Sequence, residues 1–119
     1  TINAKQMNLE VINSLQKPDL FEKFKIQTNR DFELSGVQEF LPNMDSNNLD
    51  YLNQEFYNSI LKLEMSNALK NLLYRIDITE LQIKSAANKN PQTSMQHLLA
   101  ELMIKRILQK VVLKEMYSK

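Results

Sequence analysis

The chain contains no cysteine, so it can form neither a disulfide nor a thiolate metal site, and a cysteine nucleophile is excluded. It has one glycine and three prolines. β-Sandwiches and barrels need many tight turns, which recruit these two residue types. Their scarcity therefore favours a few long elements. A single glycine also excludes the glycine-rich fingerprint of dinucleotide-binding proteins.

Long apolar runs are absent as well. The sequence has no stretch of about eighteen apolar residues, and its amino terminus lacks a basic segment followed by an apolar one. We therefore expect neither a membrane span nor a signal peptide, and a soluble, cytoplasmic protein. Hydrophobic residues make up 43% and charged residues 24%, as in ordinary globular proteins. A length of 119 residues suits one core, so residues 1–119 are predicted to form a single helical domain.

Charge is unevenly spread along the chain, although the net charge is only +1. Residues 31–64 hold seven acids and one base, whereas residues 101–119 hold five bases and two acids. We expect these two regions to face each other within the fold, and the alternative is that they face partners. Charge asymmetry of this kind bears on solubility and association before it bears on any particular ligand.

The first third of the chain predicts short helices. Apolar residues recur at helical spacing over residues 2–16, and Pro18 ends that pattern. Asp19 is placed to cap a second short helix that ends near Thr28. Residues 24–34 also alternate with period two, so a small hairpin remains an alternative there.

A third short helix is predicted at residues 33–41, despite the cost of about 1 kcal/mol for Gly36 in its middle. Pro42 ends this helix. The segment 43–48 has no periodicity and is rich in turn formers, which indicates a loop.

Residues 49–76 give the clearest helical signal, and their apolar face changes sides near residue 63. One face carries the first set of apolar residues and roughly the opposite face carries the second: Leu49, Leu52, Phe56, Ile60 and Leu63, then Leu61, Met65, Leu69, Leu72 and Ile76. No glycine or proline interrupts the segment, so we predict one continuous helix. The alternative is a break near Ser66, with a new helix beginning at Asn67.

The carboxyl-terminal third predicts two more helices. Thr79 followed by Glu80 suits a helix start, and a helix is expected over 80–88 before a turn at 88–91. The last helix is predicted from 94 to 117. Its apolar residues point in several directions, so it must be covered on several sides, either by the domain or by a partner. The sequence thus predicts an all-α bundle of four to six helices, with the helices at about 49–76 and 94–117 as its spine.

The best candidate binding residues lie on that last helix. Arg106, Lys110 and Lys114 follow one another at four-residue spacing and make a basic ridge, and Leu98 and Leu102 lie on an apolar side of the same helix. Such a ridge can contact an acidic protein surface or nucleic-acid phosphates. The near-neutral chain lacks the large positive excess typical of nucleic-acid binders.

Candidates for chemistry are few. His97, the only histidine, lies four residues before Glu101, but position 94 is Ser where a helical di-iron site needs Glu. Asp77 and Glu80 could divide acid and base roles, although capping of a helix explains this cluster as well. No serine nucleophile elbow, phosphate-binding loop or zinc-protease motif occurs. We therefore predict no catalytic residue, metal site, cofactor or small-molecule substrate.

Together these patterns predict a non-enzymatic helical interaction module that self-associates or docks a protein partner. The alternative is a nucleic-acid-associated helical domain that uses the basic ridge.

Overall fold

A computed structural model describes the backbone of residues 4–117 and the side chains of residues 9–117. Within these residues the chain forms six α-helices, one 3₁₀ turn and no strand, which confirms the all-α prediction. The elements are α1 (Ala4–Leu15), α2 (Pro18–Leu34), η1 (Gln38–Phe40), α3 (Leu49–Met65), α4 (Leu69–Ile76), α5 (Glu80–Lys89) and α6 (Met95–Tyr117).

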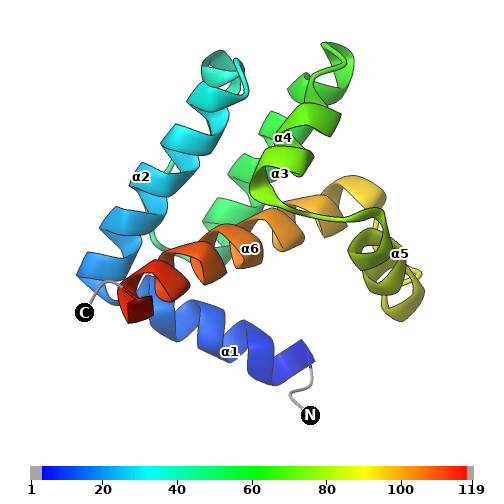
Figure 1. The fold of residues 1–119 in the computed structure, drawn as a ribbon. Coiled ribbons are helices and arrows are strands. Elements are labelled where there is room, and N and C mark those ends of the chain that lie inside the picture. The colour runs from blue at the N-terminus through cyan, green and yellow to red at the C-terminus, as the bar shows by residue number, and fades with distance from the viewer. Residues whose placement is uncertain (1–3, 118–119) are drawn as a thin grey trace.

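The last helix, α6, runs through the middle of the bundle (Figure 1). It packs against α2, α3, α4 and α5, while α1 packs against α2 and α3. Eight residues of α6 are buried, from three sides of the helix: Leu98, Leu99, Ala100, Met103, Ile104, Ile107, Leu108 and Val111. The prediction that this helix must be covered on several sides is confirmed for its length up to Val111.

Aromatic rings fill the space between α2, α3 and α6. Phe24, Phe32 and Phe56 are fully buried, and the ring centroids of Phe24 and Phe56 lie 6.1 Å apart. Burial of such rings contributes about 1.5–3 kcal/mol each relative to exposure. The core continues with Leu52, Ile60 and Leu63 of α3 and with Leu72 and Ile76 of α4.

The first helix ends where the sequence predicts. α1 stops at Leu15, and Pro18 occupies the first turn of α2, where its missing N–H costs nothing. Asp19 lies in that first turn but does not cap it, because the capping position is Lys17 and no side chain bonds there. Residue 2 of the predicted first helix, and the side chains of Ala4 and Met7, lie outside the described residues.

The hairpin alternative at residues 24–34 is wrong, and so is a helix end near Thr28. α2 is 17 residues long and continues past Thr28 to Leu34. Its buried positions follow helical spacing: Phe24, Gln27, Thr28, Asp31 and Phe32. The Thr28 hydroxyl donates to the Phe24 carbonyl at 2.8 Å, so this residue is satisfied inside the helix rather than at its end.

The helix predicted over 33–41 is also wrong. Gly36 has a φ of 73° and ends α2, so only the single turn of η1 forms before Pro42. Nothing lies within 4 Å of an added Cβ at Gly36, which leaves the left-handed backbone as the reason for glycine here.

The continuous helix predicted over 49–76 is broken. α3 ends at Met65, α4 begins at Leu69, and Asn67 between them has a φ of 58°. The Ala68 N–H donates to the Leu63 carbonyl at 3.0 Å and the Asn67 N–H to the Glu64 carbonyl at 3.2 Å. The break lies where the alternative placed it, but Ser66 ends α3 instead of capping α4.

This break has a packing cause. In one straight helix, Leu63 and Leu72 would point in roughly opposite directions. The turn at Asn67 reorients the chain, so that both side chains become fully buried in the same core. The gain from burying Leu72 and Ile76 therefore outweighs the helical hydrogen bonds lost at the break.

Three helices end in the same Schellman geometry. α2, α3 and α4 each end in a left-handed residue, namely Gly36, Asn67 and Asp77. After each of these, the next N–H reaches back to a carbonyl five residues earlier, as in Ile78 to Leu73 at 2.9 Å. Asn and Asp take the place of glycine in a chain that has only one.

The start of α5 forms as predicted. The Gln82 N–H donates to the Thr79 hydroxyl at 3.1 Å, and the Gln82 side chain accepts from the Thr79 N–H at 2.8 Å. This is a complete capping box. The predicted helix over 80–88 is confirmed.

Candidate interaction site

The predicted basic ridge on α6 is tied to neighbouring helices. Arg106 Nη2 lies 2.7 Å from Asp77 Oδ2 at the end of α4. Lys110 Nζ lies 2.9 Å from Asp31 Oδ2 of α2, and Lys114 Nζ donates to the Gln27 Oε1 at 2.6 Å. All three charged groups therefore have partners within the fold.

One of these pairs joins the acidic and basic regions of the sequence. Asp31 belongs to the acidic stretch and Lys110 to the basic one, and the Asp31 side chain is only 3% exposed. Gln27 Nε2 donates to the same carboxylate at 3.1 Å. Asp77, the partner of Arg106, lies outside the acidic stretch, so only part of the charge asymmetry is resolved by contact between the two regions.

The two leucines predicted with the ridge do not lie on an open surface. Leu98 is 3% exposed and belongs to the interior. Leu102 is half-buried and packs against the core. The five predicted partner-binding residues are thus not gathered into one exposed patch.

The residues considered for chemistry have structural contacts. The His97 ring stacks on Tyr57 with centroids 4.1 Å apart, and its Nδ1 lies 2.6 Å from the Ser94 hydroxyl. Asp77 ends α4 in the left-handed conformation, and Thr79 caps α5. Residues 9–117 contain no group of three or more His, Asp or Glu side chains arranged to hold a metal ion.

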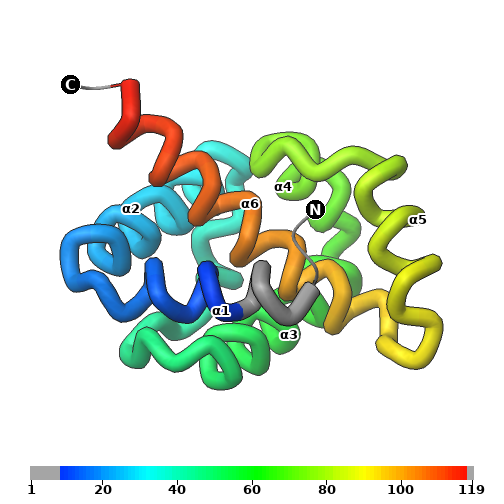
Figure 2. Tube along the Cα trace, turned by 90° about the horizontal axis from the view of Figure 1, so that it is seen from below, coloured from blue at the N-terminus to red at the C-terminus, as the bar shows by residue number. Residues whose placement is uncertain are grey.

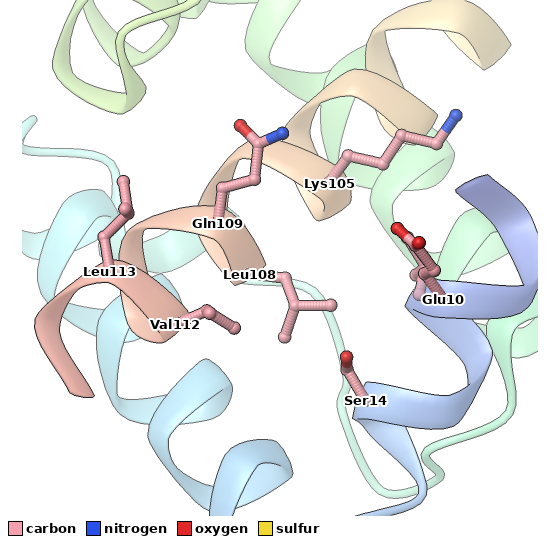
Figure 3. A pocket seen from close by; sticks show the side chains of 8 residues that line it. Glu10, Ser14, Lys105, Leu108, Gln109, Val112 and Leu113 are labelled. Carbon is pink, nitrogen blue, oxygen red and sulfur yellow. The ribbon is translucent and has the colours of Figure 1, made fainter. Parts of the chain in front are cut away.

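An open groove lies between α1 and α6. It has a volume of about 410 Å³, and its apolar residues are Val11 of α1 and Leu108, Val112 and Leu113 of α6. Figure 3 shows Glu10 and Lys105 at one end of this groove and Leu113 at the other.

Apolar side chains continue beyond this groove. None of residues 112–117 is buried. Among them, the side chains of Leu113 and Met116 are 44% and 65% exposed. The last turns of α6 lie at the edge of the bundle (Figure 2), where Lys114 and Glu115 still bond to Gln27 and Lys23 of α2. The sequence signal for this surface was the scatter of apolar residues around α6, which did not reveal that α1 would form the second wall.

A second groove, of about 850 Å³, lies between α4 and α5. It begins at the turn after α3 and continues past the capping box of α5. Its apolar residues are Leu69 and Leu73 of α4, Ile78 of the connecting turn and Ile83 of α5. Sequence reasoning missed this groove, because it forms only when the chain breaks at Asn67 and turns again at Asp77.

The chain matches no protein-family model, no curated protein and no solved structure. Among residues 4–117, no helix is both long enough and apolar enough to cross a membrane. The functional argument therefore rests on the two grooves and on the contacts of α6.

Proposed function

We propose that this chain is a non-enzymatic helical interaction module, and that it self-associates through the α1–α6 groove. The observation that supports the proposal is the apolar surface of α6 past Val111, where α2 covers one side of the helix and Leu113 and Met116 stay 44% and 65% exposed. Contiguous exposed apolar surface on a folded chain commonly marks an interaction site.

The charges at the groove favour a second copy as the occupant. Glu10 on α1 and Lys105 on α6 line the same end of the groove, one acid and one base. A two-fold axis beside this end places Glu10 of each copy opposite Lys105 of the other. The partner's α6 then covers the apolar groove. A partner with charge of one sign would leave one of the two groups unpaired.

The basic ridge gives less support to the nucleic-acid alternative. Phosphate binding requires free cationic groups. Arg106 and Lys110 form ion pairs with Asp77 and Asp31, and Lys114 is bonded to Gln27. Contact with phosphate would have to compete with these partners.

Exchange of the two charges tests self-association. Sedimentation of the wild-type chain should give the mass of a dimer. Glu10→Lys alone and Lys105→Glu alone should each shift the particle toward the monomer, because each places like charges together at both symmetry-related contacts beside the two-fold axis. When the two variants are mixed in equal amounts, the dimer should return, since each contact again joins opposite charges.

Glu33→Lys and Lys84→Glu are matched controls, because both residues are exposed and lie outside the groove. They should leave the dimer unchanged. A wild-type monomer at every concentration reached would refute the proposal. Failure of the mixture to restore the dimer would also refute it, because an effect within one chain cannot be repaired by a second.

A further inference from the structure

α5 is the helix that the fold supports least. None of its ten residues is buried, and among the described helices it packs substantially only against α6. A helix this short is marginal by itself, so it depends on its capping box and on tertiary packing. Ile83, its main apolar residue toward the bundle, stays half-buried.

The α4–α5 groove lies where further packing is missing. α4 and α5 form its two walls, and Leu69, Leu73 and Ile83 each remain half-buried along it. α4 spans eight residues, or about 12 Å of helix axis. An inserted helix of a few turns would cover these side chains and give α5 a second neighbour.

The rim of this groove carries an acidic excess. Glu64, Asp77 and Glu80 line it together with one base, Lys70. Arg106 neutralises Asp77 from outside the groove, whereas the Glu64 carboxylate accepts a bond from the neutral amide of Gln96 at 3.2 Å and has no ion pair among side chains 9–117. No ion pair is found for Glu80 among the described side chains, so two carboxylates face one lysine.

An exposed aromatic ring adds to this preference. Tyr74 lines the groove and is 87% exposed. Its ring face can attract a Lys or Arg side chain within about 6 Å of the centroid. Carboxylates and an open aromatic ring beside apolar walls recognise a helix that has one apolar face and basic flanks.

We propose that the α4–α5 groove binds a basic amphipathic helix of another protein. This site is distinct from the α1–α6 groove and needs no second copy of the chain. Binding holds α5 against the inserted helix, so occupancy of the groove and ordering of α5 are coupled.

The test uses two synthetic helical peptides with the same leucine face, one with lysine and one with glutamate on the polar positions. Titration is carried out on the Glu10→Lys chain, so that self-association does not contribute to the result. The lysine peptide should bind at least about tenfold more tightly than the glutamate peptide, with an affinity that falls as salt rises. Amide exchange in α5 should slow on binding.

Glu64→Lys combined with Glu80→Lys should weaken the lysine peptide by about tenfold or more, and Tyr74→Ala should also weaken it. The matched control is Glu33→Lys with Glu39→Lys, an equal charge change on exposed residues outside the groove. It should change binding by less than about twofold. Equal binding of both peptides, or equal loss in the control, would overturn the proposal. A monomeric wild-type chain would not, because that result concerns the other groove.

Discussion

The carboxylate of Asp31 on α2 and the ammonium group of Lys110 on α6 lie 2.9 Å apart, with 3% and 20% of their side chains exposed. Gln27 donates a further bond to Asp31, and Lys110 Nζ lies 3.5 Å from the Arg75 carbonyl. A largely buried ion pair of this kind fixes the register of α2 against α6. Its net contribution to stability is small while both partners are present, because both charges are desolvated.

Removing one partner should therefore cost more than removing both. Lys110→Ala leaves the Asp31 carboxylate buried without its cation, and we expect it to lower the free energy of unfolding by about 3 kcal/mol. Replacement of both residues by leucine should cost clearly less. Urea unfolding followed by circular dichroism measures the difference.

Lys84→Ala, at an exposed position in α5, is the control and should change stability by less than about 0.5 kcal/mol. If Lys110→Ala behaved like this control, the ion pair would be broken in solution.

The turn at Asn67 predicts a second effect. The left-handed conformation costs a residue with a Cβ about 1–2 kcal/mol. Asn lowers this cost, and Gly, which has no Cβ, avoids it. Asn67→Ala should therefore destabilise the chain by about 1 kcal/mol, whereas Asn67→Gly should be neutral or slightly stabilising. Thermal unfolding monitored at 222 nm compares the two.

Asn71→Ala, at an exposed position in α4, should be neutral or stabilising because Ala favours a helix interior. Equal stability of Asn67→Ala and Asn67→Gly would show that the left-handed turn is absent.

How much of this could be predicted from the sequence depends on the range of the interaction involved. Pro18, Thr79 and the apolar spacing of α6 act locally, and the elements that they predict form. The break at Asn67 is harder to predict from the sequence. Local propensity allows a continuous helix, and only the burial of Leu72 in the same core as Leu63 decides against it. Over residues 24–34 the sequence fits both a period-two alternation and a helical spacing of buried residues. The helical spacing includes the polar residue Asp31, whose burial the sequence does not indicate.

The candidate site was less predictable still. The four-residue spacing of Arg106 and Lys110 predicts a ridge, but their partners Asp77 and Asp31 come from distant parts of the chain. Each groove needs two helices that are far apart in sequence or joined by a sharp turn. Periodicity within one helix cannot supply that arrangement.

The internal pairing of the ridge leads to a prediction on nucleic acids. Because Arg106 and Lys110 are held by carboxylates, the wild-type chain should not be retained on immobilised heparin or duplex DNA at about 0.15 M salt. Elution should coincide with that of the Lys110→Ala chain. Retention that falls steeply with salt and disappears when Arg106, Lys110 and Lys114 are all changed to Glu would instead support the nucleic-acid alternative.

Loss of the Thr79 cap should destabilise α5 locally and leave the rest of the fold intact. Thr79→Ala removes the acceptor for the Gln82 N–H, which typically costs about 1 kcal/mol of helix stability. Because α5 contributes no buried residue, its opening exposes little core, and urea unfolding of the whole chain should change little. Amide exchange in residues 83–89 should accelerate by about fivefold, as that energy implies. Ser85→Ala, which is exposed in the same helix and makes no cap, is the control and should not accelerate exchange. If Thr79→Ala lowered the global free energy of unfolding by the full amount, α5 would belong to the cooperative core, and its ordering by an inserted helix would lose its physical basis.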